Sequence, residues 1–182
     1  SRAELHRCDS AERASALRLF ATLRSSYQAL DGIWHAAGVL ADGTVAKQDA
    51  RLVRRVFGPK AHGAQMLHTA SSTCALCVCL LFSSMAALLG GAGQSNYAAA
   101  NAFLDGHATY RRMAAQHGSS VHWGPWAEVG MATGSSVQAR MGAHQGITLI
   151  GLAEGLATLQ HAIEPCVSPV LAMVPANWER LT

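Results

Sequence analysis

The chain has 182 residues, a length within the usual range of one domain. Half of its residues are hydrophobic and only 14% are charged, so it can bury a core and is not an intrinsically disordered tail. The formal net charge is +3 and the basic residues are scattered, which argues against a nucleic-acid-binding surface. No apolar run approaches the ~18 residues of a membrane-spanning helix, so no membrane partner is expected.

Short apolar runs alternate with longer amphipathic stretches, which is typical of a parallel α/β sheet. Residues 4–8 are expected to form the end of a strand, and Asp9 or Ser10 caps the helix that follows. The apolar face of this helix recurs at three- and four-residue steps, at Leu17, Phe20, Leu23 and Tyr27. A short strand over residues 32–36 follows, and the apolar run ends at Gly38.

The middle of the chain predicts two long helices separated by a buried strand. Residues from about 48 to 70 have the period of a helix, which Pro59 should kink because proline lacks a backbone donor. The inward residues of this helix are expected to be Leu52, Val53, Val56, Ala64 and Leu67. Residues 75–82 are continuously apolar, which is typical of a strand covered on both faces. A helix over residues 97–115 follows.

The last third continues the same alternation. A strand over residues 120–123 ends at Gly124-Pro125, and residues 127–149, rich in Gly and Ser, are expected to form a mobile excursion from the sheet. A helix over residues 152–163 and a strand over residues 169–174 complete the pattern. The predicted fold class is therefore α/β, with a parallel sheet and helices on both of its faces.

Five cysteines and nine histidines raise the question of a metal or redox site. Cys74-x-x-Cys77 is compatible with a redox pair or half of a zinc site, but no second pair with suitable His spacing accompanies it. We expect buried structural thiols in a reducing compartment, the cytoplasm, with an organelle as the alternative. No histidines have the paired helical spacing of a zinc site, so no metal is expected.

Four polar residues stand out against the apolar scaffold. Ser84 ends the buried strand, where residues of a parallel sheet meet ligands, and Tyr97 follows thirteen residues later at a helix start. Asn101 lies one helical turn beyond Tyr97, and Lys60 lies one βα unit upstream of Ser84. Such a group suits carbonyl reduction, because an ammonium beside a phenol helps it to supply a proton. Taken singly, each residue has a structural alternative as a packing, capping or solvated side chain.

Four stretches resemble one family, in the right order. FSSMAALLGGAGQSNYAAANAFLD (residues 82–105) closely resembles the active-site segment of ketoreductase domains in modular polyketide synthases, which belong to the short-chain dehydrogenase/reductase superfamily. WHAAGVLADG (34–43), GPKAHGAQMLH (58–68) and WGPWAEVGMA (123–132) resemble further motifs of these domains, and NWERL near the C-terminus resembles their closing segment. The resemblance implies a Rossmann-like fold that uses NADPH.

The resemblance also implies a role for each of the four polar residues. Tyr97 is expected to donate the proton, Ser84 to donate a second hydrogen bond to the carbonyl oxygen, and Asn101 to assist the proton relay. Lys60 would lower the pKa of Tyr97 and contact the nicotinamide ribose. Ordinary members of the superfamily carry their lysine four residues after the tyrosine. This chain has Asn101 there and its lysine at position 60, as synthase ketoreductases do.

The same resemblance implies the cofactor contacts, although half of the cofactor site is missing from the sequence. The expected NADPH contacts are Asp9, His35, Ala36, Ala37, Gly38, Lys60, Tyr97, Gly124, Pro125 and Met131, the last opening the lid. A simple helix cap is the alternative for Asp9. The G-x-G-x-x-G turn that should open the first βα unit does not occur in this sequence.

Stereocontrol is expected to depend on Asp42, Leu89, Gln94 and Met131. One class of these domains carries a Leu-x-Asp motif after the nucleotide loop, and the opposite class a Trp eight residues before the Tyr. Here Leu40-Ala41-Asp42 keeps the first motif and position 89 is Leu, which predicts a D-configured 3-hydroxyl product. The alternative is that Asp42 merely caps a turn with Gly43.

Together these features predict that residues 1–182 are the C-terminal catalytic part of one ketoreductase domain, lacking its first βαβ portion. The expected reaction is NADPH-dependent reduction of a β-ketoacyl thioester on an acyl carrier protein. The upstream half of the domain and neighbouring synthase domains are expected partners. Without that half, the first strand should be an exposed apolar edge and the chain inactive. The alternatives are a fatty-acid-synthase ketoreductase and an inactive structural ketoreductase fragment.

Overall fold

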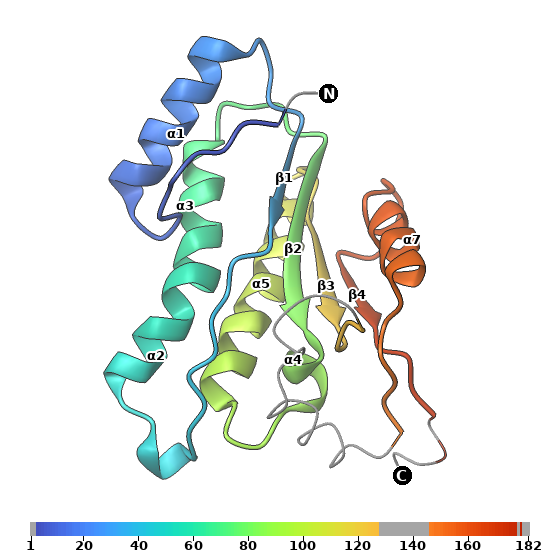
Figure 1. The fold of residues 1–182 in the computed structure, drawn as a ribbon. Coiled ribbons are helices and arrows are strands. Elements are labelled where there is room, and N and C mark those ends of the chain that lie inside the picture. The colour runs from blue at the N-terminus through green and yellow to red at the C-terminus, as the bar shows by residue number, and fades with distance from the viewer. Residues whose placement is uncertain (1–2, 128–145, 178, 180–182) are drawn as a thin grey trace.

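Four parallel strands form the centre of the computed structural model, which describes residues 3–127, 146–177 and 179. The strands neighbour one another in chain order, as β1 (Gly32–His35), β2 (Val78–Ser84), β3 (Ser119–Trp123) and β4 (Val170–Met173) (Figure 1). Because all four run in the same direction, their carboxyl ends lie at one edge of the sheet. The predicted parallel α/β fold is confirmed.

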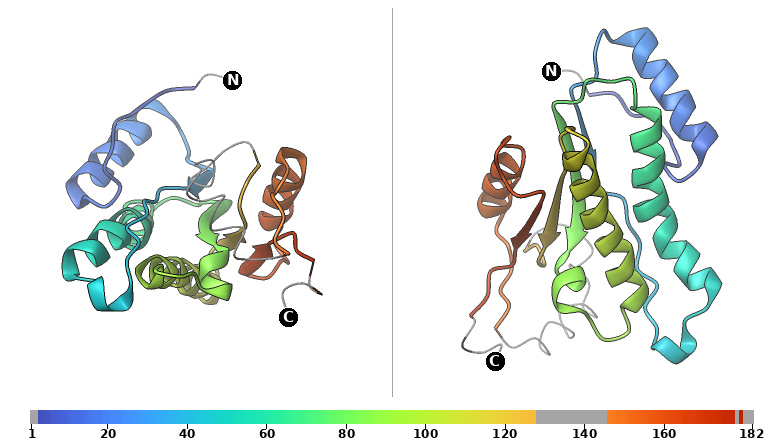
Figure 2. Two further views of the ribbon diagram at one scale, coloured as in Figure 1. Left: turned by 60° about the horizontal axis from the view of Figure 1, so that its bottom comes forward. Right: turned by 180° about the vertical axis from the view of Figure 1, so that it is seen from behind.

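Helices connect the strands and cover both faces of the sheet (Figure 2). Among the described residues they are α1 (Arg13–Ser26), α2 (Ala50–Phe57), α3 (Gly63–Ala70), α4 (Met85–Leu89), α5 (Ser95–Met113) and α7 (Leu152–Ala162). A short 3-10 turn, η1 (Val45–Lys47), precedes α2. None of the described helices has both the length and the apolar character needed to cross a membrane.

The alternation of side chains along β2 explains how the two helical layers are attached. Cys79 and Leu81 point to one face and pack with Ala64 of α3 and Leu104 of α5. Leu80 points to the opposite face, where it joins an apolar cluster that includes Ala162 of α7. Such a strand is buried from both sides, which accounts for its continuous apolar run.

The helix predicted over residues 48–70 is interrupted where Pro59 was expected to disturb it. A π-helical turn, η2 (Gly58–His62), separates α2 from α3, and Pro59 lies in its first positions. Val56 and Ala64 are buried as predicted, whereas Val53 is 36% exposed and does not belong to the core.

The N-terminal predictions need correction. Residues 4–8 form no strand, because no described strand lies beside them to pair with. The first helix begins at Arg13 rather than after Asp9, whose carboxylate instead accepts the Ala11 N–H at 2.9 Å in the turn before the helix. Of the expected inner face, Phe20 is buried, but Leu17 is 44% exposed. Tyr27 lies beyond the last turn and is also exposed.

The cysteine-rich segment also differs from expectation. The expected strand over residues 75–82 begins only at Val78, so Cys74 and Cys77 both precede β2. Cys79 is buried, whereas Cys77 is exposed and Cys74 is half-buried. The expectation of buried thiols therefore holds for Cys79 but not for its neighbours. The lid expected over residues 127–149 falls mostly outside the described residues.

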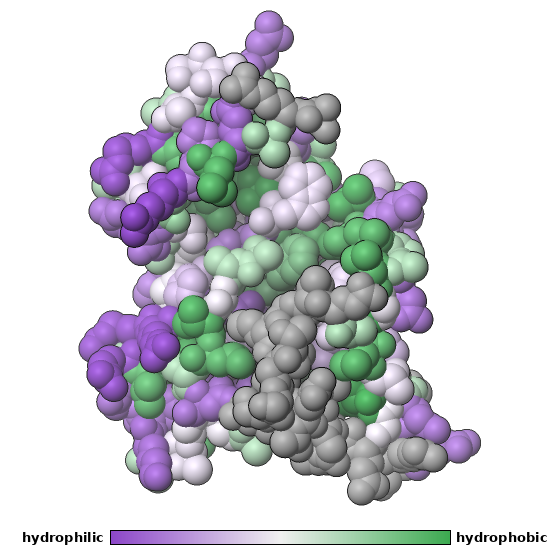
Figure 3. All heavy atoms as spheres, in the orientation of Figure 1, coloured by the Kyte–Doolittle hydropathy of each residue, from purple (hydrophilic) through white to green (hydrophobic). Residues whose placement is uncertain are grey.

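β1 lies at the edge of the sheet, as the sequence predicted for a strand lacking its neighbour. Trp34 in this strand is 54% exposed, and Leu156 of α7 is exposed to the same extent. Apolar side chains gather over β1, β2 and α7 on the face of the molecule seen in Figure 3. In the described sheet, β1 thus combines an edge without a neighbouring strand with the exposed side chain of Trp34.

We predict that Leu104→Ala lowers the free energy of unfolding of the complete domain by about 2–5 kcal/mol, because it leaves a cavity between α5 and the sheet. Leu104 is fully buried. Met113→Ala at the end of the same helix is the matched control, since Met113 is 84% exposed and its truncation should change stability little. Urea unfolding of both variants measures the difference, and equal losses would contradict the packing described here.

Candidate active site

The predicted site residues come together at the carboxyl edge of the sheet. Ser84 is the last residue of β2 and the N-cap of α4, where its Oγ accepts the N–H of Ala86 at 3.2 Å. Tyr97 lies in the first turn of α5, which packs against both α4 and β2. The Ser84 hydroxyl uses its oxygen in the cap, so its proton stays available for another acceptor.

Tyr97 is nearly buried, at 6% exposure, in an apolar cluster with Ala41, Val56, Ala86 and Ala100. Burial raises the pKa of its phenol, and the charge of Asp42 acts in the same direction. Interactions with the side chains of Ser84 and Asn101 oppose this rise in pKa. The phenol is therefore protonated at neutral pH and lies among groups that favour its ionised form.

Lys60 projects from η2 into the same region and is only 3% exposed. Its Nζ donates a hydrogen bond to the carbonyl of Phe82 at 2.8 Å and lies 5.4 Å from the centre of the Tyr97 ring. Burial lowers the pKa of the Lys60 ammonium to about 8, partly opposed by the charge of Asp105. A lysine with this pKa changes its charge close to working pH.

The loop after β1 passes directly over Lys60. A Cβ on Gly38 would lie 2.9 Å from the Lys60 Cε, so the glycine allows backbone and lysine to approach closely. His35 is also buried, and its Nε2 donates to the carbonyl of Lys60 at 3.0 Å. Burial lowers the pKa of His35, so a neutral ring joins β1 to the turn that carries Lys60.

Asn101 is fully buried one turn beyond Tyr97 on α5. Its Nδ2 donates to the Tyr97 carbonyl at 2.8 Å, whereas its Oδ1 has no hydrogen-bond partner among the described residues. A buried acceptor without a partner is uncommon and marks a place where a donor from water or a ligand fits. The free Asn101 Oδ1 is an acceptor and the Lys60 ammonium is a donor, so the two could bind the hydroxyls of the expected nicotinamide ribose.

The loop predicted to control stereochemistry is fixed to the start of α5. The Gly43 N–H donates to the Gly93 carbonyl at 2.9 Å, and Gln94 Nε2 donates to the Asp42 carboxylate at 3.3 Å. Leu89 ends α4 and is 41% exposed. Asp42 thus contacts an active-site loop across 52 positions of sequence, which is more than a local turn cap with Gly43.

The remaining predicted cofactor residues lie along the same edge or nearby. Ala36 and Ala37 are exposed directly after β1, and Gly124-Pro125 directly follows β3. Ser10, the neighbour of Asp9, lies close to Gly63, as does His35, since a Cβ on Gly63 would lie 2.8 Å from the Ser10 Oγ and 3.0 Å from the His35 ring. Met131 lies outside the described residues.

Two features of the site were missed by the sequence analysis. Asn96 is buried, its Nδ2 donates to the Ala41 carbonyl at 2.8 Å, and its Oδ1 accepts the Tyr97 N–H at 2.7 Å. Asp105 bonds to Ser120 and His122. The available signal was their position: Asn96 adjoins Tyr97, and Asp105 follows Asn101 by one helical turn.

A Rossmann-like sheet with a buried Tyr97, a buried Lys60 and a half-buried Ser84 at its carboxyl edge defines the class of the molecule. Comparison with known proteins defines the family. The chain belongs to the KR domain family, whose model matches residues 1–128.

The similar proteins are synthases and ketoreductases. The spectinabilin polyketide synthase system protein NorB of Streptomyces orinoci is 40% identical over 158 residues, which are 86% of this chain and 7% of NorB. An A-type ketoreductase structure from a modular polyketide synthase matches 99% of this chain and 38% of its own, with a TM-score of 0.91 and 35% identity. The structure of a C2-type ketoreductase from a modular polyketide synthase matches this chain over its whole length, with a TM-score of 0.81 and 29% identity; the match covers 38% of the C2-type chain. The overall fold therefore does not distinguish these types.

We predict that Asn96→Ala destabilises the complete domain by about 1–3 kcal/mol, because the buried Ala41 carbonyl and Tyr97 N–H both lose their partner. Ser95→Ala is the control, since Ser95 is exposed in the same turn. Denaturant unfolding with intrinsic fluorescence measures both variants. Stability of Asn96→Ala within experimental error of Ser95→Ala would refute the role of Asn96.

Proposed function

We propose that this chain carries the catalytic half of a ketoreductase domain that reduces a β-ketoacyl thioester to the 3-hydroxyacyl thioester with NADPH, in polyketide biosynthesis. One observation carries the proposal: a buried phenol interacts with Ser84 and Asn101, and an ammonium lies 5.4 Å from its ring. A phenol, a hydroxyl and a cation together suit an oxygen that gains negative charge.

The residues of the chain divide the work at the carbonyl oxygen. NADPH, when bound, supplies the hydride that adds to the β-carbon. Tyr97 gives its phenolic proton to the carbonyl oxygen, which becomes the hydroxyl, and Ser84 donates a hydrogen bond to the same oxygen. Lys60 stabilises the phenolate left on Tyr97, because an adjacent positive charge favours the ionised phenol. Asn101 holds the turn of α5 and offers its free Oδ1 to the relay that returns a proton to Tyr97.

This chain has residues that fit the nicotinamide end of NADPH. The pyrophosphate of NADPH, however, would need residues from elsewhere. Gly38, Lys60 and Asn101 present close backbone, an ammonium and a free acceptor. No G-x-G-x-x-G turn occurs in the sequence to hold the phosphates at a helix N-terminus. We therefore propose that the upstream half of the domain pairs with β1, adds this turn, and is required for activity.

The substrate is proposed to arrive on the phosphopantetheine arm of an acyl carrier protein in the same assembly. The related proteins are polyketide synthases much longer than this chain, which supports neighbouring synthase domains as partners. A fatty-acid-synthase ketoreductase would use the same site on a different chain. An inactive structural fragment is disfavoured, because Ser84, Tyr97, Lys60 and Asn101 remain convergent and largely buried.

In the complete domain, we expect Tyr97→Phe to lower turnover by about 10²-fold or more while NADPH still binds, since only the proton donor is lost. Tyr110→Phe on the same helix is the matched control, because Tyr110 is 57% exposed near the other end of α5. The assay follows NADPH consumption with a diketide thioester, and cofactor fluorescence reports binding. Turnover of Tyr97→Phe within threefold of the parent would refute the role of Tyr97 as proton donor.

We further expect a D-configured 3-hydroxyl product, because Gln94 holds Asp42, whose charge acts on Tyr97, and because position 89 is Leu rather than Trp. Chiral chromatography of the diketide product measures the configuration. The double variant Asp42→Ala with Leu89→Trp should lower the selectivity, because it removes the carboxylate of the Leu-x-Asp motif and introduces the tryptophan of the opposite class. Mainly L-configured alcohol from the parent would refute the assignment.

A further inference from the structure

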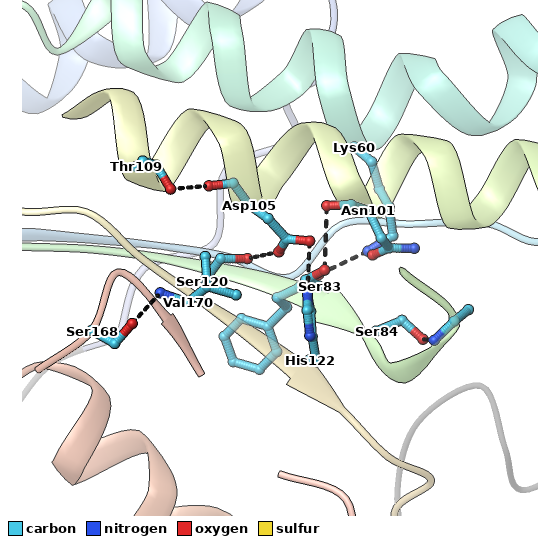
Figure 4. A network of polar contacts seen from close by, with 12 residues as sticks. Lys60, Ser83, Ser84, Asn101, Asp105, Thr109, Ser120, His122, Ser168 and Val170 are labelled. Carbon is cyan, nitrogen blue, oxygen red and sulfur yellow. Dashed lines mark hydrogen bonds and ion pairs between the residues drawn. The ribbon is translucent and has the colours of Figure 1, made fainter. Parts of the chain in front are cut away.

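A polar cluster joins α5 to β3 behind the proposed catalytic residues. Asp105 Oδ1 accepts a hydrogen bond from Ser120 Oγ at 2.7 Å, and its Oδ2 accepts one from His122 Nε2, also at 2.7 Å (Figure 4). The side chains of His122 and Asp105 are 9% and 17% exposed. Short bonds in a largely dry layer fix the position of the carboxylate closely.

This cluster is continuous with the catalytic residues along both elements. On α5, Tyr97, Asn101 and Asp105 follow one another at four-residue steps and share one face of the helix. Across the sheet, His122 pairs with Ser83, whose Oγ donates to the Asn101 carbonyl at 3.3 Å. Ser83 adjoins Phe82, whose carbonyl accepts the hydrogen bond from Lys60.

The side chains of Asp105 and Lys60 lie on the same side of β2 (Figure 4). No carboxylate lies within ion-pair distance of Lys60 in the part of the chain that the structure describes. Burial lowers the pKa of Lys60, and the charge of Asp105 acts to raise it. Of the other groups nearby, His35 is kept neutral by burial and Tyr97 is kept protonated. Asp42 acts on the phenol of Tyr97.

We propose that Asp105 is a positioning residue of the active site, which Ser120 and His122 hold in place so that its carboxylate keeps the Lys60 ammonium charged. The catalytic part of this inference rests on the proposed function, whereas the effect on the charge of Lys60 does not. Because the pKa of Lys60 is about 8, its charge is present below that pH and is lost as the pH rises through it. Removing the Asp105 charge should move this loss to lower pH.

The test is the Asp105→Asn variant in the complete ketoreductase domain. Asparagine keeps the size of the side chain, and a neutral His122 can accept its amide by changing tautomer. The pH midpoint of Lys60 is measured by NMR of protein carrying 13C at the lysine Cε, which needs neither turnover nor access of a reagent to the buried amine. We expect the midpoint to fall by roughly half a unit or more. The alkaline limb of kcat/KM should shift equally.

Glu164→Gln is the matched control, because Glu164 is an exposed carboxylate that also contacts a histidine, His161 at 3.1 Å. It should leave the Lys60 midpoint and the pH profile unchanged. If Asp105→Asn fails to fold, Asp105→Ser removes the same charge and leaves a hydroxyl for Ser120 and His122. An unchanged Lys60 midpoint in a folded, charge-removed variant overturns the proposal. If the Lys60 midpoint shifts but the domain reduces no thioester, the proposed role of Asp105 stands and the proposed function is refuted.

Discussion

The burial of one ammonium group sets the requirements for the rest of this structure. Lys60 is almost wholly removed from water, which is unfavourable for a charge unless hydrogen bonds and opposing charges compensate. The compensation comes from three groups on two elements: the carbonyl of Phe82 on β2, and the ring of Tyr97 and the more distant carboxylate of Asp105 on α5. The lysine can remain charged only while η2, β2 and α5 keep their mutual positions.

The same burial couples the lysine to the tyrosine. Low polarity raises the pKa of the Tyr97 phenol and lowers that of the Lys60 ammonium, so each group alone tends toward its neutral form. In the proposed reaction, however, a charged lysine stabilises the phenolate that forms once the tyrosine has given up its proton. The apolar cluster around Tyr97 therefore contributes both to stability and to chemistry, because it excludes water that would weaken this electrostatic coupling.

Local pattern was sufficient to predict those features whose cause is local. The apolar run before Ser84 and the helical period after Tyr97 located β2 and α5, and Pro59 marked the place of the π-helical turn. Residues 4–8 were wrongly predicted as a strand, because a strand exists only where a neighbour pairs with it.

Contacts between distant segments were beyond the reach of periodicity. Asn96 acts through the Ala41 carbonyl, 55 positions away, and Asp105 through Ser120 and His122 on the next strand. An isolated asparagine or aspartate on a helix has the same sequence signature whether it faces solvent or a partner. Only the register of β3 against β2 brings His122, which bonds to Asp105, beside Ser83.

The residues proposed for the reaction all occur in this sequence, whereas the G-x-G-x-x-G turn proposed to hold the cofactor phosphates does not. Among the described residues, Tyr97, Lys60 and Asn101 make hydrogen bonds with β1, β2 and α5. The unpaired edge of β1, with its exposed Trp34, lies on the opposite side of that strand from β2. A partner that pairs with this edge can therefore add a phosphate-binding turn without rearranging the reacting groups. Under the proposed function, the positions of Tyr97, Lys60 and Asn101 depend on contacts within this chain, whereas the pyrophosphate of the cofactor would be held by residues from elsewhere.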